Sequence, residues 1–133
     1  MQSHIEKGKK NEKFLSLIEE HGKNDYLDWN ITVCFYSALH YVKAYLKKHG
    51  YNTNSHKEID QNIRHTSLIC NVKFDEKHYR AYADLKTYSS TARYSGVYSG
   101  PLQELLLKNN SIESKKFLSL IKLYLTSKGM KLI

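Results

Sequence analysis

Apolar residues recur along the chain at spacings of three and four, which is typical of helices that bury one face. No stretch of alternating polar and apolar residues is long enough to predict a strand. The pattern predicts helices over Ser3–His21, Asp28–His49, His56–Ile69, Asp75–Tyr94 and Ile112–Ser127, with a short extra helix starting at Pro101. We therefore expect an all-α fold, an antiparallel up-and-down bundle of about five helices in a single domain over residues 1–133.

Local signals mark the ends of these segments. A glycine in HGKND is expected to end the first helix, and Gly50 the second. Three residues are suited to cap helix N-termini: Asp28, Ser55 and Asp75. Glu58 stands at the capping-box position after Ser55. The apolar stripe of the first helix is predicted to consist of Phe14, Leu15, Leu17 and Ile18. The chain has one proline and six glycines, which favours long uninterrupted helices.

The second helix divides into two stripes at 100° per residue. An ordinary core seam is formed by Phe35, Leu39, Val42 and Leu46. A second stripe, about 100° away, contains Trp29, Val33, Tyr36, His40, Lys43 and Lys47. His40 therefore stands beside the predicted core rather than in it, one turn after Tyr36.

The fourth helix carries a polar stripe at core-like spacing, made of Tyr82, Lys86, Ser89 and Arg93. A polar stripe in a bundle faces solvent or another polar stripe across a cleft. The stripe containing Tyr36 and His40 is the natural partner, so His40 and Arg93 are predicted to share a cleft. The alternatives are a hydrogen-bonded, structural His40 and a stripe that is simply solvated.

Charge and composition narrow the function classes. The formal net charge is +8, which favours an anionic partner, either a nucleic acid or an acidic surface. The N-terminus has no apolar signal-peptide region, and no window approaches the ~20 apolar residues of a membrane span, so we expect a cytoplasmic protein. Cys34 and Cys70 show neither a CxxC motif nor metal-ligand spacing. They are expected to be reduced buried thiols, with a disulfide left open, and no metal or cofactor is expected.

Three segments carry a family resemblance over about residues 26–96. They are DWNITVCFYSALHYVKAYLKKHG, NSHKEI and YADLKTYSSTARY. Together they resemble the bacterial HEPN-like helix-bundle proteins, in which a Trp and an FYxxLH run share one helix. In that subgroup a Ser-His pair opens the next helix, and a YxxL…S…ARY run closes the following one. The matching residues are Trp29, Phe35, Tyr36, Leu39 and His40; Ser55 and His56; and Tyr82, Leu85, Ser89, Ala92, Arg93 and Tyr94.

The resemblance implies an up-and-down helix bundle that is often dimeric, so a homodimer is expected. Members of the family include metal-independent ribonucleases of toxin–antitoxin and phage-defence systems. Others bind RNA or nucleotides, or act as partners of nucleotidyltransferases. For this chain the resemblance thus implies RNA or a nucleotide as ligand, with a nucleotidyltransferase or an antitoxin as an alternative protein partner.

The active ribonucleases of the family carry an Arg followed, after four to six residues, by a His on the same helix. This chain departs from that motif, because none of the positions following Arg64, Arg80 or Arg93 at that spacing is His. Catalysis would then need a substitute, with His40 as the base for the 2′-OH and Arg93 as the cation for the phosphorane. The other candidate ligand contacts are Tyr36, His56, Tyr82, Lys86, Ser89, Lys43 and Lys47.

Three functions follow from these observations. The first is an RNA- or nucleotide-binding module, the second is a metal-independent endoribonuclease, and the third is a non-catalytic partner or scaffold subunit. The missing Arg-to-His motif favours the first and third over the second. The positive charge favours the first over the third.

Overall fold

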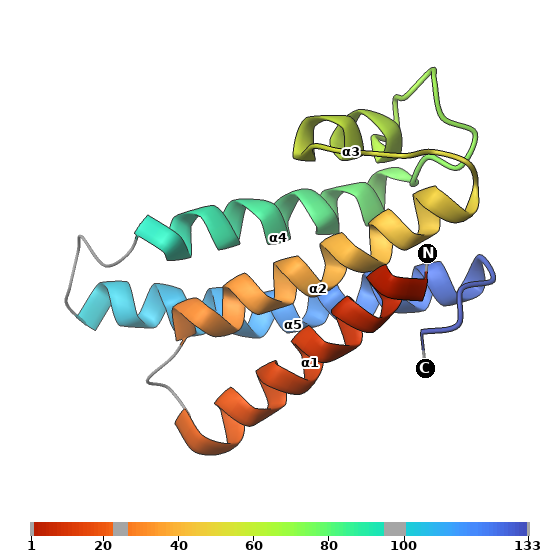
Figure 1. The fold of residues 1–133 in the computed structure, drawn as a ribbon. Coiled ribbons are helices and arrows are strands. Elements are labelled where there is room, and N and C mark those ends of the chain that lie inside the picture. Colours follow the sequence, from red (N-terminus) through yellow and green to blue (C-terminus); the bar gives the residue numbers. More distant parts are fainter. Residues whose placement is uncertain (1, 23–26, 95–100, 133) are drawn as a thin grey trace.

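The computed structural model describes residues 2–22, 27–94 and 101–132, and in these the chain forms five helices and no strand. The helices are α1 (Gln2–Gly22), α2 (Leu27–Lys48), α3 (His56–Ile63), α4 (Glu76–Tyr94) and α5 (Pro101–Ser127). Figure 1 shows the four long helices α1, α2, α4 and α5 running alternately up and down the bundle, with the short α3 above one end of α4. The predicted all-α, up-and-down bundle is confirmed.

The central helix is α2, which packs against α1, α4 and α5. Its predicted core seam of Phe35, Leu39, Val42 and Leu46 is buried. Residues outside this seam, among them Ile31, Cys34, Ala38 and Tyr41, are buried as well, so α2 is enclosed around most of its circumference. Because α1 and α4 both pack against α2, the surface of α2 determines which of their residues contact it.

Two of the three predicted N-caps are confirmed. Ser55 Oγ accepts a hydrogen bond from the backbone N–H of Glu58 at 3.2 Å, and the Asp75 carboxylate accepts one from the N–H of His78 at 2.9 Å. Asp28 was a wrong prediction, because α2 already includes Leu27 and Asp28 lies inside its first turn. A carboxylate in the first turn still interacts favourably with the helix dipole.

Two helix lengths differ from the predictions. The third helix ends at Ile63 rather than Ile69, because Arg64 adopts extended backbone angles and the Ile63 carbonyl accepts a hydrogen bond from the N–H of Phe74. The segment from Pro101 to Ser127 is one helix rather than two, since neither glycine nor proline interrupts it after Pro101. Residues 23–26, between α1 and α2, and residues 95–100, between α4 and α5, lie outside the described residues.

The apolar stripe of α1 was only partly predicted. Leu15 is buried, but Phe14 and Leu17 are about half exposed, and the side chain of Ile18 lies outside the described residues. Among the α1 residues whose burial the structure describes, the buried positions are Ile5, Gly8 and Leu15. α1 packs mainly against α2, so it buries only a narrow strip.

The contact between α1 and α2 depends on the absence of a side chain at Gly8. A Cβ at this position would come closer than 3.0 Å to three carbons of the Tyr41 ring. The ring is held in place because its hydroxyl donates a hydrogen bond to Glu12, whose other carboxylate oxygen accepts one from Lys122 at 2.9 Å. The ring therefore cannot move aside without breaking polar contacts.

We expect Gly8→Ala to lower the free energy of unfolding by about 1–3 kcal/mol, the usual cost of overpacking a well-filled contact. Denaturant unfolding followed by circular dichroism measures this change. Lys9→Ala, at the next and exposed position of α1, is the matched control and should change the stability little. A Gly8→Ala variant as stable as the wild type would show that the two helices separate easily.

Cys34 and Cys70 are both buried, and neither is part of a disulfide. Within the described part of the chain, no helix is long and apolar enough to cross a membrane.

Candidate functional site: a basic, histidine-containing face

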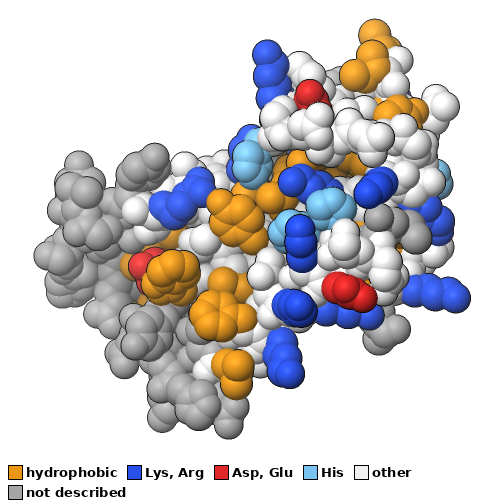
Figure 2. Space-filling model, in the orientation of Figure 1, with side chains coloured by type: hydrophobic (Ala, Val, Ile, Leu, Met, Phe, Trp, Pro, Cys, Tyr) orange, Lys and Arg blue, Asp and Glu red, His pale blue; other side chains and the backbone are white. Residues whose placement is uncertain are grey.

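One face of the bundle collects most of the predicted site residues. Figure 2 shows lysine, arginine and histidine side chains close together over the middle of this face, with few acidic side chains among them. We refer to this surface as the basic face. The residues that define it are His4, Tyr36, His40, Lys43, Lys47, His56, Lys86 and Arg93.

His40 meets a second histidine at the basic face. The imidazole rings of His40 on α2 and His4 on α1 stack with their centroids 5.5 Å apart, and their Nδ1 atoms are 3.3 Å apart. Burial, followed by the neighbouring His4, Lys43 and Lys7, lowers the pKa of His40 to about 4. Burial and Lys43 lower the pKa of His4 as well. At neutral pH both rings are therefore uncharged, and one Nδ1–H donates to the other Nδ1.

Arg93 on α4 binds to α2 through Tyr36. Its Nη1 donates a hydrogen bond to the Tyr36 hydroxyl at 3.1 Å. The two residues line a pocket of about 370 Å³ between the first half of α2 and the C-terminal end of α4. The other lining residues of this pocket are Asp28, Trp29, Thr32 and Ala92. We call it the Trp29 pocket.

The structure brings α2 and α4 together as predicted, but it gives His40 and Arg93 different partners. His40 contacts His4, Arg93 contacts Tyr36, and His40 is not among the residues that line the pocket at Arg93. Tyr36 lies one turn before His40 on the same face of α2, so the two groups are neighbours along one surface. A cleft shared directly by His40 and Arg93 stays a prediction.

His56, the first residue of α3, lies near cations of α2 and α4. Its ring stacks on the buried Phe35 ring at a centroid distance of 5.8 Å. Burial lowers the pKa of His56, and the nearby cations Lys86, Lys43 and Arg93 lower it further. Three nearby cations that disfavour the protonated form of His56 make the electrostatic potential at this point positive. An anion bound here would be stabilised.

Tyr82 and Ser89 are fully buried, so the structure does not place them where a ligand could reach them. The Tyr82 ring packs against Phe35 at 5.8 Å, because this part of the polar stripe on α4 lies directly on α2. Neither hydroxyl has a hydrogen-bond partner among the described residues. From the same stripe only Lys86, which is half-buried, and Arg93, which is exposed, reach the surface.

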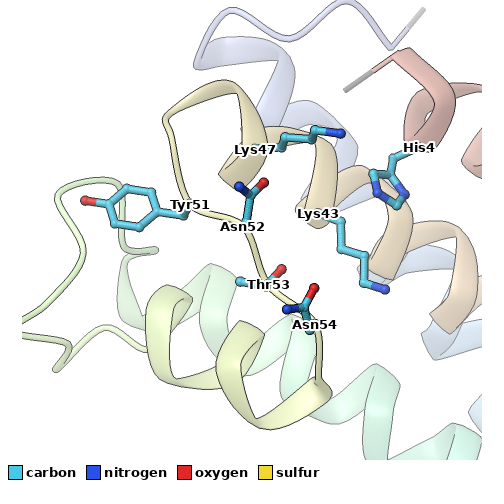
Figure 3. A pocket seen from close by; sticks show the side chains of 7 residues that line it. All are labelled: His4, Lys43, Lys47, Tyr51, Asn52, Thr53 and Asn54. Carbon is cyan, nitrogen blue, oxygen red and sulfur yellow. The ribbon is translucent and has the colours of Figure 1, made fainter.

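A second, more polar pocket lies at the far end of the basic face. It has a volume of about 370 Å³ and is lined by His4, Lys43, Lys47, Tyr51, Asn52, Thr53 and Asn54. Figure 3 shows Lys43 and Lys47 extending from α2 beside His4, with the segment of residues 52–54 on the opposite side and the Tyr51 ring turned away. We call it the lysine pocket. Two ammonium groups and three uncharged polar side chains suit a phosphate, which accepts hydrogen bonds from both kinds of donor.

The sequence of the chain matches a known family. The model of the HEPN domain matches residues 4–124 of the chain. The chain belongs to the HEPN domain family. None of the curated proteins and none of the solved structures matches it.

Membership in the family supports a role of this HEPN domain in nucleotide or RNA biology. The family match extends from α1 into α5, and so includes both sides of the His4–His40 contact. Within the described residues of the HEPN domain, no group of three His, Cys, Asp or Glu side chains is placed to hold a metal ion.

Two parts of the basic face were missed by the sequence analysis. His4 belongs to a polar stretch of α1 and meets His40 only because the helices pack in antiparallel order; the two are 36 positions apart. The segment of residues 52–54 appears in the sequence as an ordinary polar turn. No local pattern indicates that it closes the lysine pocket of the HEPN domain.

Proposed function

We propose that this HEPN domain binds single-stranded RNA or a nucleotide along the basic face, with phosphates held at the lysine pocket and at Arg93. Family membership supports a ligand of this class. His4 lines the lysine pocket and contacts His40, and His56 lies near both Lys43 and Arg93, so one strand held at both anchors would pass the histidines.

The observation that carries the proposal is that cations gather on the basic face without forming ion pairs to described carboxylates. Lys43, Lys86 and Arg93 all lie near His56, and Lys43 and Lys47 line the lysine pocket together. Among the described residues, no ion pair to a carboxylate is formed by Lys43, Lys47, Lys86 or Arg93. Uncompensated charges on one face attract an external anion and speed its association.

Single-stranded RNA fits this surface better than a duplex does. Proteins that bind single strands combine a basic groove along the backbone with aromatic side chains that stack on bases. The basic face has this combination, because Trp29 is 55% exposed beside Arg93.

The endoribonuclease with His40 as base and Arg93 as cation receives less support than binding does. A general base works best with a pKa near the operating pH, whereas burial and its neighbours lower the pKa of His40 to about 4. No specific observation favours a toxin–antitoxin role, a nucleotidyltransferase or antitoxin partner, or a scaffold subunit. The homodimer also stays a prediction.

Binding of a short fluorescent single-stranded RNA, measured by anisotropy in EDTA, tests the proposal. If three or four phosphates are neutralised, affinity should fall by about 20- to 50-fold between about 50 mM and about 200 mM salt. Absent binding at the lower salt, or binding indifferent to salt, would contradict the proposal. Recovery of the RNA at full length supports a binding module, whereas shortened RNA in EDTA would establish the ribonuclease instead.

A further inference from the structure

We propose that the Trp29 pocket is a base-specific subsite that accepts guanine, with the phosphate of the same nucleotide held by Arg93. The inference rests on the proposed function, because it names the base that the RNA or nucleotide presents at one end of the basic face. It is carried by three lining residues of different chemistry: an indole, a carboxylate and a guanidinium.

The indole provides the stacking surface. Trp29 is 55% exposed, although tryptophan is usually well buried in folded proteins. It shares the pocket with the Tyr36 ring, two turns further along α2, and with the methyl group of Ala92 on α4. The volume of about 370 Å³ lies within the range of small-ligand pockets, about 300–1,000 Å³. A flat heterocycle therefore fits between an aromatic and an aliphatic wall.

The carboxylate selects among the bases. Asp28 lines the pocket, and its carboxylate forms no hydrogen bond or ion pair with a described residue; only its backbone carbonyl is used, accepting from the Thr32 hydroxyl at 2.9 Å. An ionised carboxylate accepts hydrogen bonds and donates none. It therefore fits a base that presents two donors side by side.

Guanine is the base with that edge. Its N1–H and its N2 amino group are adjacent donors, which the two oxygens of one carboxylate can accept together. Adenine and cytosine present a ring-nitrogen acceptor next to their amino group, and uracil flanks its single N–H with two carbonyl oxygens. Each of these acceptors would face the Asp28 carboxylate and repel it.

The guanidinium supplies the phosphate contact. Arg93 uses Nη1 to donate to the Tyr36 hydroxyl, and a guanidinium has five N–H donors in all. The bond to Tyr36 positions the group at the α4 side of the pocket, and the remaining N–H groups can bind a phosphate in bidentate geometry. The opposite charges of Asp28 and Arg93 thus match the base and the phosphate of a single nucleotide.

The chain contains one tryptophan, so fluorescence excited at the red edge of tryptophan absorption, where tyrosine does not absorb, reports on this pocket. The test is to titrate the whole protein with GMP, AMP, CMP and UMP in turn and to follow quenching of Trp29. Each good bidentate contact to a base discriminates by about 1–3 kcal/mol, so we expect GMP to bind at least about fivefold more tightly than the other three nucleotides.

Asp28→Asn tests the selecting group, because the amide replaces one acceptor oxygen by a donor. Quenching should persist through stacking, while the preference for GMP should fall to near parity. Asp84→Asn, an exposed carboxylate on α4 beside Tyr88, removes the same charge elsewhere and should keep the preference. Circular dichroism confirms that both variants are folded.

The outcomes separate this inference from the proposed function. Salt-sensitive RNA binding with no quenching by mononucleotides, or with equal quenching by all four, would overturn the guanine subsite and leave the binding function standing. GMP-selective quenching without RNA binding would retain the subsite and refute the proposed RNA-binding face. A blue shift of Trp29 emission that grows with protein concentration, without nucleotide, would assign the pocket to a second copy of the chain and overturn the inference.

Discussion

Replacing Lys43 and Lys47 together by glutamate is expected to weaken binding of single-stranded RNA by more than about tenfold at low salt. Both ammonium groups line the lysine pocket and form no ion pair with a described carboxylate. Reversing their charge removes two phosphate contacts and places two carboxylates beside the remaining phosphates. The slope of log affinity against log salt should become shallower by about 1.4, from about 0.7 for each lost single-strand contact. Anisotropy titrations at several salt concentrations measure both quantities.

The matched control makes the same charge change away from the basic face. Lys108 on α5, which passes behind α2 in Figure 1, and Lys77 near the start of α4 are exposed, and neither forms an ion pair with a described carboxylate. Lys108→Glu with Lys77→Glu should weaken binding far less, because only the long-range charge of the protein changes. Equal losses in the two double variants would mean that RNA responds to net charge alone, and the lysine pocket would then lose its assigned role.

Acidification is expected to destabilise the wild-type protein more than a His40→Gln variant. The pKa of His40 is about 4 in the folded chain, against an ordinary value of 6.5. Above pH 6.5 the ring is neutral in both states and contributes nothing to the pH dependence. As the pH falls from 6.5 towards 4, the unfolded chain takes up the proton first, so the free energy of unfolding decreases. We expect this to amount to about 1–3 kcal/mol, since His40 is only partly buried.

Denaturant unfolding at a series of pH values between 7.5 and 4.5 measures this difference. The wild type and His40→Gln should converge in stability towards low pH, while His49→Gln, at an exposed histidine just beyond α2, should follow the wild-type curve. If the stability curves of His40→Gln and the wild type run parallel, the lowered pKa of His40 is refuted.

Acidification is expected to strengthen RNA binding, although it lowers the stability of the free protein. A phosphate next to His4 and His40 favours their protonated forms, so affinity should increase as the pH falls below 6.5.

Local features of the fold were predictable because each depends on a few neighbouring residues. Ser55 and Asp75 cap their helices as expected, since a short polar side chain before an amphipathic segment meets the first free N–H groups. Asp28 was misassigned because the helix start depends on Leu27 as well, which is buried and extends the helix by one residue. The early end of α3 depends on Phe74, which is distant in the sequence. Its backbone N–H donates a hydrogen bond to the carbonyl of Ile63.

The candidate site was predicted less completely. Helical spacing placed Tyr82, Ser89 and Arg93 on one face of α4, but it does not tell whether that face meets solvent or another helix. In the structure, Tyr82 and Ser89 are buried against α2 and only the end of the stripe, at Arg93, is exposed. Tyr36 was expected to line a cleft shared by His40 and Arg93; the structure joins Tyr36 to Arg93 by a hydrogen bond, and the shared cleft stays a prediction.

The sequence by itself determined the all-helical class, the order of the long helices, the core seam of α2 and the family, because periodicity and the order of short motifs are properties of the linear chain. Only the tertiary structure decided that His40 lies against His4, that the polar segment of residues 52–54 closes the lysine pocket, and that Asp28, Trp29 and Arg93 line one pocket. These contacts join residues far apart in the chain. They depend on how α1, α2 and α4 are rotated and aligned when they pack, and that is set by side chains along the whole length of each helix rather than by a pattern at the site.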